Sequence, residues 1–290
     1  MIIAVINEIT FFLVGVIMSI INIFSKTDVG IKRDQNEDSI RTLQVMSGGL
    51  DGESRHYALI LADGMGGYAK GEVASRIACD GFAQFSILGL PAIFEGDNTP
   101  SEIRKRFEKS VAETLNNVNE EIWNLSEGGK MGCTLVYEVI YDDHLYLAHV
   151  GDSRAYMVKK GEIEQITKDH SYVNALLDNN AITEEEAEEH PMRHVITKSV
   201  GSTEKVTADY NLFNLNENVN LLMCSDGLTD MLRDNEIRDI ILNNNPAQIC
   251  QKLVDGANEK GGKDNISVIL ARITSGGKKR TVMKPIRVSS

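Results

Sequence analysis

The sequence predicts an α/β sandwich of the α+β class, in which helices flank two antiparallel β-sheets. Short runs rich in Val, Ile, Leu and Tyr are separated by Gly, Asn and Asp turns, which is the pattern of strands. Two turns, YDDHL and KKGEI, are typical of hairpins and indicate antiparallel pairing of consecutive strands. Strands and helices do not alternate strictly along the chain, which disfavours a doubly wound parallel sheet.

The expected strands are short, and most of them are bounded by polar turn residues. They cover residues 39–46, 56–62, 133–141, 144–150, 154–160, 219–224 and 265–273. The first two runs are separated by SGGLDGES, which favours a hairpin between them. We therefore expect 39–46 and 56–62 to be neighbours in one sheet.

The expected helices are fewer and longer than the strands. Residues 71–87 carry apolar side chains at helical spacing, and 101–127 form an amphipathic helix for which Ser101 is the expected N-cap. Residues 246–260 open with a proline, which is favoured in a first helical turn. Residues 171–191 contain two short helical pieces, and the five Glu of the second are typical of a solvated helix face.

The N-terminal residues 1–24 allow two interpretations. Residues 9–24 form a 16-residue apolar run, whereas a helix across a bilayer needs about 20 residues. A membrane anchor over residues 2–21 reaches that length, and the basic residues after it would keep the body of the chain in the cytoplasm. Alternatively Met18 is the start, and INIFSKTDVG is an ordinary first strand. No basic residue precedes the run, which disfavours a secretory signal.

The rest of the chain is one expected domain, residues 25–274, followed by a basic flexible tail over 275–290. A formal net charge of −12 argues against nucleic-acid binding. The four cysteines show no CxxC spacing, which indicates buried thiols in a reducing compartment rather than disulfides or a zinc site.

Five aspartates lie at the ends of expected strands, at positions that antiparallel pairing brings together. In the predicted hairpin, Asp38 precedes the first strand and Asp63 follows the second, so both lie at its open end. Asp226 follows another apolar run and Asp264 precedes one. Asp152 follows a further run, so all five can collect at one rim of a sandwich.

Such a set of carboxylates repels itself unless a cation neutralises it. Carboxylates without His or Cys partners select Mg²⁺ or Mn²⁺ over zinc. Two such ions about 4 Å apart can produce a hydroxide at neutral pH and bind a phosphoryl oxygen. Arg33, in GIKRDQNEDSI, offers donors suited to that phosphate, although this stretch alone is equally typical of a solvated turn.

The motifs as a set resemble the metal-dependent Ser/Thr protein phosphatases, the PPM or type 2C family, and most closely its single-domain bacterial branch. They run in family order over residues 20–273, from DVGIKRDQNEDS and ADGMGGYAKGEVAS through GCT, HVGDSRAY, ITKDHS, HPMRHVITKSVG and LMCSDGLTD to GGKDNISVILA. The resemblance implies the family's β-sandwich with flanking helix pairs. It also implies hydrolysis of phosphoserine and phosphothreonine in proteins by direct attack of water held by two metals, without a phosphoenzyme.

The resemblance assigns roles to residues by position. The two Mn²⁺ or Mg²⁺ ions would be bound by Asp38, Asp63, the carbonyl of Gly64, Asp226 and Asp264. Arg33 would bind the substrate phosphate, and Glu37 would act through metal-bound water; Arg33, Asp38 and Asp226 are thus the expected catalytic residues. A third ion would be bound by Asp152 and Asp226. Asn265 and Ser153 match the motifs without an assigned role.

The chain departs from the eukaryotic pattern at Met65, where a histidine is a proposed general acid. Methionine cannot donate a proton, and no residue is assigned this role, although His149, His170 and His194 are present. The segment 169–195 resembles the family's flap, and its acidic face is expected to select protein substrates. The expected partners are phosphorylated proteins and a cognate Ser/Thr kinase, and a monomer is expected.

Three other functions compete with this interpretation, and the sequence argues against two of them. An inactive interaction module would lack metal-binding aspartates, and none of the expected ones is missing. A Ca²⁺-binding regulator would carry a loop with EF-hand ligand spacing, which the sequence lacks. A phosphatase for small molecules has no feature in these motifs that would exclude it.

Overall fold

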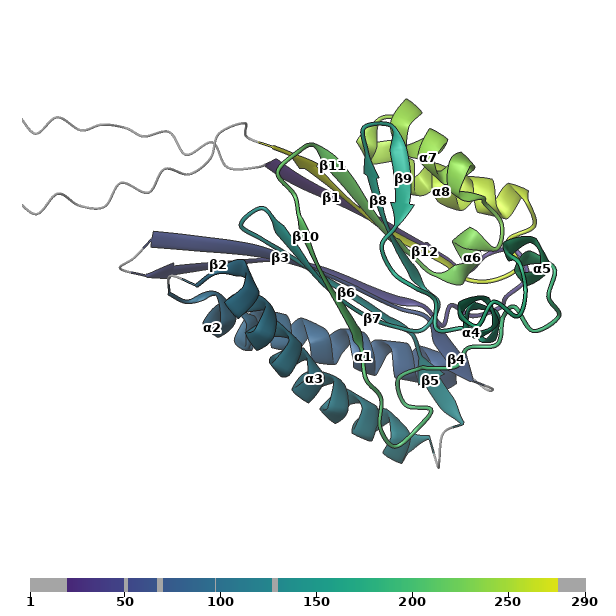
Figure 1. Cartoon of the computed structure of the whole chain (residues 1–290), viewed down its shortest axis with the longest axis horizontal. Coiled ribbons are helices and arrows are strands. Elements are labelled where there is room, and N and C mark those ends of the chain that lie inside the picture. The colour runs from purple at the N-terminus through teal and green to yellow at the C-terminus, as the bar shows by residue number, and fades with distance from the viewer. Residues whose placement is uncertain (1–19, 50–51, 67–69, 97, 127–129, 276–290) are drawn as a thin grey trace, which may run out of the picture.

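The computed structural model describes residues 20–49, 52–66, 70–96, 98–126 and 130–275, and their arrangement is a sandwich of two five-stranded antiparallel sheets (Figure 1). The first sheet contains, in spatial order, β1 (Ile20–Asp28), β12 (Ile266–Thr274), β11 (Val219–Cys224), β8 (Arg154–Lys159) and β9 (Glu162–Gln165). The second contains β10 (Asp209–Asn214), β7 (His144–Val150), β6 (Leu135–Tyr141), β3 (Gly52–Ala62) and β2 (Ser39–Gly49). A small pair, β4 (Gly64–Gly66) and β5 (Met131–Cys133), extends from one end.

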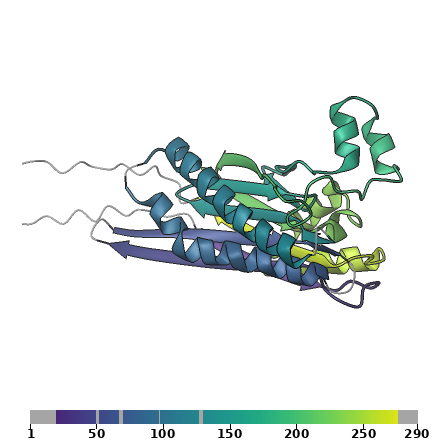
Figure 2. The same cartoon turned by 90° about the horizontal axis from the view of Figure 1, so that it is seen from below.

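Helices cover both outer faces of the sandwich, as Figures 1 and 2 show. The second sheet packs against α1 (Lys70–Leu88), α2 (Leu90–Phe94) and α3 (Pro100–Leu125). The first packs against α6 (Asp226–Thr229), α7 (Asp234–Asn243) and α8 (Pro246–Glu259). Two short helices, α4 (Tyr172–Asp178) and α5 (Glu184–Glu188), project from one end of the sandwich. The predicted antiparallel sandwich flanked by helices is therefore confirmed.

Three apolar layers hold this arrangement together. One lies between the two sheets and includes Leu59, Val136 and Met223. The other two lie beneath the helices, around Phe82 on one side and around Leu253 on the other. Because β6 and β7 are buried on both faces, their sequences are apolar at most positions rather than alternating, with the buried Glu138 and His149 as exceptions.

The predicted hairpins are present. Ser39 pairs with Ala62 across β2 and β3, so residues 38 and 63 meet at the open end. The turn between β6 and β7 places both Asp142 and Asp143 at positive φ, and Lys160 and Gly161 do the same between β8 and β9. Positive φ at both central positions is the mark of the type I′ hairpin turn, which matches the twist of the flanking strands.

Two expectations about element boundaries were wrong in detail. The long helix α3 is capped by Thr99 and not by Ser101: the Thr99 hydroxyl accepts from the backbone N–H of Glu102, and the Glu102 carboxylate accepts from the backbone N–H of Thr99. The expected strand 133–141 is divided at Thr134, because β5 pairs with β4 while β6 pairs with β3 and β7. The elements β4, β9, β10, α2, α6 and α7 were not predicted from the sequence.

The first strand begins inside the apolar N-terminal run. Residues Ile20–Asp28 pair with β12 along their whole length, so the strand interpretation of this stretch is confirmed and Ile20 and Ile21 belong to the sheet. The rest of the expected anchor, and the tail from residue 276, lie outside the described residues. Within the described ranges, the structure contains no helix with the length and hydropathy needed to cross a bilayer.

Candidate metal centre

The five aspartates predicted at strand ends lie at one end of the sandwich, where the two sheets meet. Asp38 precedes β2 and Asp63 follows β3, both in the second sheet. Asp226 follows β11 and Asp264 precedes β12, both in the first sheet, where Cys224 pairs with Val268. Asp152 follows β7, which also belongs to the second sheet and ends at the same rim. Antiparallel pairing therefore brings together residues that are up to 226 positions apart.

Asp38 connects the two sheets through a serine. Its side chain is 8% exposed, and one carboxylate oxygen accepts a 2.8 Å hydrogen bond from the hydroxyl of Ser225, next to Asp226. The backbone N–H of Ser267 in turn donates to the Ser225 hydroxyl oxygen at 2.9 Å. The other oxygen of Asp38 is buried without a hydrogen-bond partner among the described residues. A buried carboxylate oxygen without a donor is a position that a cation can fill.

Burial and mutual repulsion control the charge of the cluster. Burial raises the pKa of Asp38 to about 6, with the charge of Asp264 adding to the effect. The pKa of Asp63 lies well above its ordinary value, because burial and then the charges of Asp38 and Asp226 disfavour ionisation. The pKa of Asp226 is raised in the same way by burial and then by Asp152. Without a cation, several of these groups would hold protons near neutral pH.

Thr134 connects Asp63 to the neighbourhood of Asp152. The Thr134 hydroxyl accepts from the backbone N–H of Asp63 at 2.9 Å, and the Thr134 N–H donates to the Asp63 carbonyl at 2.8 Å. The same hydroxyl lies 2.7 Å from the hydroxyl of Ser153. Asp152 is 9% exposed, and burial raises its pKa to about 7. The break between β5 and β6 at Thr134 thus fixes the positions of two rim aspartates.

Arg33 lies beside the cluster on a loop that Asn265 holds in place. The Arg33 guanidinium donates a 2.7 Å hydrogen bond to Asp264, which raises the pKa of Arg33, and its side chain remains 51% exposed. Asn265 accepts from the backbone N–H of Glu37 at 2.8 Å. Its amide N–H₂ donates to the carbonyls of Val29 and Gln35, at 2.9 Å each. Asn265, which matched a motif without a role, therefore fixes the loop that carries Arg33 and Glu37.

Two glycines of the Asp-Gly pairs let backbones pack closely at the rim. A Cβ atom on Gly64 would lie 2.2 Å from the carbonyl oxygen of Gly71 and 2.5 Å from that of Glu37. A Cβ atom on Gly227 would lie 2.0 Å from the carbonyl oxygen of Asn265. Because these contacts are to backbone atoms of α1 and of the loops before β2 and β12, a larger residue could enter only by displacing those segments.

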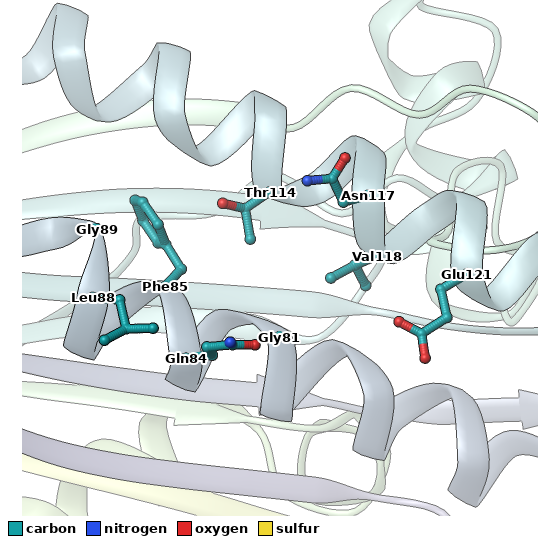
Figure 3. Close-up of a pocket in the computed structure, with 9 residues that line it drawn as sticks. All are labelled: Gly81, Gln84, Phe85, Leu88, Gly89, Thr114, Asn117, Val118 and Glu121. Carbon is teal, nitrogen blue, oxygen red and sulfur yellow. The ribbon is translucent and has the colours of Figure 1, made fainter.

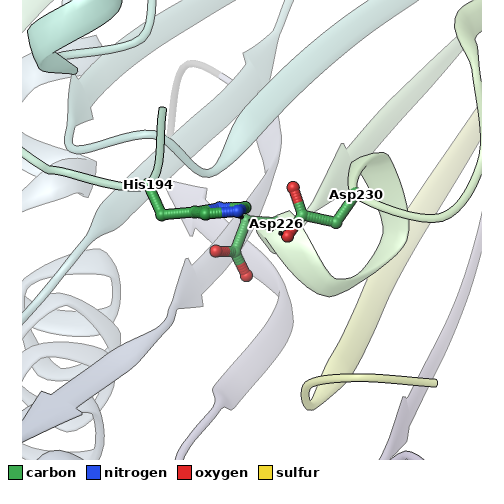
Figure 4. A group of neighbouring side chains, drawn as sticks. All are labelled: His194, Asp226 and Asp230. Atoms are coloured by element: carbon green, nitrogen blue, oxygen red, sulfur yellow. Dashed lines mark ion pairs between the residues drawn. The ribbon is translucent and has the colours of Figure 1, made fainter. Parts of the chain in front are cut away.

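Two residues that the sequence left without a role also lie at this rim. His194, from the segment between α5 and β10, places Nδ1 3.4 Å from a carboxylate oxygen of Asp230 (Figure 4). One ligand atom each of His194, Asp226 and Asp230 lies within 4.8 Å of the others. Asp230 follows Asp226 by four residues, one helical turn, which is a spacing that could have indicated a second acidic group on the same side. No comparable spacing in the sequence indicated that His194 would lie at the rim.

The expected flap, residues 169–195, consists of α4, α5 and their connections. Its ends are held together by a bridge between Ser171 and Ile196 and by the Tyr172 N–H, which donates to the Val195 carbonyl at 2.8 Å. The His170 N–H donates to the Gly151 carbonyl at 2.8 Å, next to Asp152. The flap is therefore attached to the rim that carries the aspartates.

A groove of about 400 Å³ lies elsewhere on the surface, between α1 and α3 (Figure 3). It is lined by small, amide and apolar side chains such as Gln84, Phe85 and Val118, with Glu121 as its one titratable lining residue. None of the rim residues lines it. This groove lacks the groups that hydrolysis would need.

The family model described as protein phosphatase 2C matches residues 35–271, most of the chain and all of the rim except Arg33. The chain belongs to the protein phosphatase 2C family. The resemblance of its motifs to that family is thereby confirmed, and membership in this family indicates dependence on a divalent metal.

Two curated protein phosphatases match this chain over nearly their whole length. Protein phosphatase PhpP of Streptococcus pneumoniae is 38% identical over 248 residues, which are 84% of this chain and 94% of PhpP. The serine/threonine phosphatase stp of Listeria monocytogenes is 32% identical over 254 residues, 84% of this chain and 93% of stp.

Solved structures of serine/threonine phosphatases share the fold. The Streptococcus agalactiae serine/threonine phosphatase superposes with a TM-score of 0.70 at 33% identity, covering 87% of this chain and 99% of that one. The catalytic domain of PstP, solved in complex with two manganese ions, gives 0.71 at 28% identity, covering 89% of this chain and all of PstP's domain.

Proposed function

We infer that this phosphatase 2C chain is a metal-dependent protein serine/threonine phosphatase. The observation that carries this conclusion is the convergence of Asp38, Asp63, Asp226 and Asp264 from two sheets at one rim, with a half-exposed arginine beside them. Relatives named as serine/threonine phosphatases cover 84% and 87% of this chain.

The rim has the donor set for hard divalent ions. We propose that Asp38, Asp63, the Gly64 carbonyl, Asp226 and Asp264 hold two Mn²⁺ or Mg²⁺ ions, and that Asp152 and Asp226 hold a third. All the side-chain donors are carboxylates, which suits these metals, and Asp38 and Asp152 each have a buried oxygen without a hydrogen-bond partner. When bound, such ions supply a hydroxide nucleophile at neutral pH and neutralise phosphoryl charge.

The surrounding residues would orient the substrate and the attacking water. Arg33 would bind phosphate oxygens, because a guanidinium carries five N–H donors and the pair with Asp264 uses only part of them. Glu37, whose pKa burial raises, would accept a hydrogen bond from water at the rim. Met65 cannot protonate the leaving serine or threonine oxygen, so that proton is assigned to solvent.

Replacing Arg33 by Ala is expected to lower kcat/KM for a phosphothreonine peptide about 10- to 100-fold, mostly through KM. This is the effect of losing one or two charge-assisted hydrogen bonds to the phosphate. Steady-state kinetics across peptide concentration would measure it, with the Mn²⁺ dependence recorded in parallel. Arg41→Ala, which removes an exposed arginine of β2 that pairs with Asp80 of α1 and not with any rim aspartate, is the matched control. An unchanged KM in Arg33→Ala would contradict the assigned role.

The substrates are proposed to be proteins phosphorylated on serine or threonine, with a cognate Ser/Thr kinase as the opposing enzyme. Phosphate release from a phosphothreonine peptide, with and without Mn²⁺, tests this directly. Release should require the metal, stop on addition of a chelator and exceed release from sugar phosphates. Preference for sugar phosphates would favour a small-molecule phosphatase, and no release from any of these compounds would favour an inactive interaction module.

The flap is proposed to select protein substrates. Its second helix carries a run of glutamates, and Glu184, Glu185 and Glu186 lie exposed in the first turn of α5. Replacing these three by Gln should change the relative rates on acidic and basic phosphopeptides by several-fold, because charges at a partner surface steer recognition. Hydrolysis of a small aryl phosphate should stay the same. Equal losses on both kinds of substrate would show that the segment supports catalysis instead.

A further inference from the structure

The position of His194 suggests a link between the flap and the rim. His194 belongs to the flap, whereas Asp226 and Asp230 lie at the two ends of α6 in the body of the protein. Figure 4 shows the three side chains pointing toward a common point from these two segments. The backbone of Asp230 donates to the carbonyl of Asp226 at 2.8 Å, so the helical turn holds both carboxylates on the side that meets the histidine.

The spacing of these groups fits ligands of one ion better than a hydrogen-bonded pair. His194 Nδ1 and Asp230 Oδ2 are 3.4 Å apart, longer than the 2.7–2.9 Å or so of a charge-assisted hydrogen bond. Ligand atoms about 2.1 Å from a divalent ion are about 3–4 Å from one another. The largest separation within the group is at most 4.8 Å, so small side-chain rotations would bring all three atoms into one shell.

An independent feature of the same place is a buried carboxylate oxygen with no partner. One oxygen of Asp152 has no hydrogen-bond donor among the described residues, and the side chain is 9% exposed. Asp152 lies near enough to Asp226 and Asp230 for their charges to interact, although it is outside the group of three residues whose ligand atoms lie within 4.8 Å of one another. A buried, unpaired oxygen next to two further carboxylates is costly unless a cation is bound.

The flap holds His194 in a defined position. The N–H groups of Arg193 and Val195 donate to the carbonyls of His190 and Met192, both at 3.1 Å, so consecutive turns lead into and out of His194. The segment then joins the rim through the Thr197 N–H, which donates to the His170 carbonyl at 2.8 Å. The His194 side chain is 49% exposed, so it can exchange Asp230 for an ion without breaking a packed contact.

We propose that His194 is a nitrogen ligand, supplied by the flap, to a divalent transition-metal ion that Asp152, Asp226 and Asp230 hold at the rim. The inference rests on the proposed metal-dependent function and goes beyond it in two respects. It adds a ligand from a segment outside the sandwich, so that binding of this ion fastens the flap to the body. It also gives this position a preference for Mn²⁺ over Mg²⁺, because imidazole suits transition metals better than Mg²⁺.

Pulsed electron paramagnetic resonance of Mn²⁺ bound to the full chain tests the proposal. Directly coordinated imidazole nitrogen produces a ¹⁴N modulation, which is expected in the wild type once the weakest rim position is filled. His194→Ala should lose this modulation and bind the last Mn²⁺ about ten-fold more weakly. The control is His190→Ala, a flap histidine whose ring accepts from the Met192 N–H and which is absent from the cluster.

Amide exchange of the flap provides a second readout that does not depend on activity. Mn²⁺ should slow exchange over residues 172–195 in the wild type and in His190→Ala, but not in His194→Ala. A ¹⁴N modulation that persists in His194→Ala, or that is absent from Mn²⁺-loaded wild type, would overturn the proposal. Phosphothreonine hydrolysis by the same samples is scored separately: hydrolysis without nitrogen coordination rejects only the His194 ligand, whereas absence of hydrolysis in all of them rejects the proposed function.

Discussion

Replacement of Asp226 by Asn is expected to abolish phosphate release and, at the same time, to raise the melting temperature of the metal-free protein. The two effects have one cause. Asp226 lies among like charges, and its pKa is raised well above the ordinary value by burial and then by Asp152, Asp230, Asp264 and Asp38. Without a cation, folding must either protonate Asp226 or bury its charge among like charges, and Asn avoids both costs. With a cation, Asn removes a ligand.

The expected changes are a rise in Tm without metal and a loss in kcat. Each kcal/mol of relieved repulsion corresponds to a rise of about 2–4 °C in Tm for a chain of this size. The loss in kcat with a phosphothreonine peptide should reach about a thousandfold, comparable to the loss of a principal stabiliser of transition-state charge. Differential scanning fluorimetry in EDTA and in Mn²⁺, together with phosphate release, measures them on the same preparation.

Asp239→Asn is a matched control for this prediction. Asp239 is an exposed aspartate on α7 that pairs with Arg238 and lies outside the cluster. Its replacement should leave activity unchanged, and Mn²⁺ should raise the Tm of this variant as much as that of the wild type. The Asp226→Asn protein should gain much less from Mn²⁺. A lower Tm in EDTA combined with a full response to Mn²⁺ would mean that Asp226 is a structural residue and not a metal ligand.

The sequence was most informative where local pairing decides the outcome. Asp38 and Asp63 flank two runs joined by a short turn, so a hairpin fixes their meeting without knowledge of the rest of the fold. Asp226 and Asp264 required one more step, because a connection that contains the three helices α6, α7 and α8 separates their two neighbouring strands in the sequence. All four aspartates could be placed at strand ends because each one lies at the start or the end of an apolar run in the sequence.

The sequence was least informative where a contact depends on a connection without regular structure. His194 reaches the rim because hydrogen bonds fix the path of the flap, and no periodicity encodes that path. Asn265 was visible as part of a motif, but its three hydrogen bonds to the Arg33 loop depend on a segment about 230 residues earlier. Such contacts arise from the packing of complete sheets and not from local propensity.

A second buried carboxyl group, Glu138 inside the sandwich, is expected to make the stability of the fold depend on pH. This residue lies in the middle of β6, opposite Leu59 of β3 and Leu147 of β7, and both leucines belong to the apolar layer between the sheets. Its side chain is completely buried, and neither carboxyl oxygen has a hydrogen-bond partner among the described residues. Burial raises its pKa from an ordinary 4.5 to about 8, so the folded protein holds the neutral acid at physiological pH.

The sign of the resulting pH dependence follows from proton binding. Below about pH 4.5 the carboxyl is protonated in both states and contributes no slope. Between that pH and about 8 the unfolded chain releases the proton while the folded chain retains it, so stability falls as pH rises. The loss is on the order of 4 kcal/mol between pH 5 and pH 8, and it stays at its full value above pH 8.

Two substitutions separate the charge of Glu138 from its polarity. Glu138→Met should remove the pH dependence and also stabilise the protein at pH 5, because the thioether needs no hydrogen bond. Glu138→Gln should remove the same pH dependence while leaving a buried polar group that still costs stability. Urea unfolding at pH 5 and pH 8 in EDTA measures both, since the rim aspartates titrate alike in wild type and variants and cancel in the difference. If the wild type and Glu138→Gln lose equal stability between these pH values, the carboxyl must reach water or a partner, and its ionisation is not suppressed by the core.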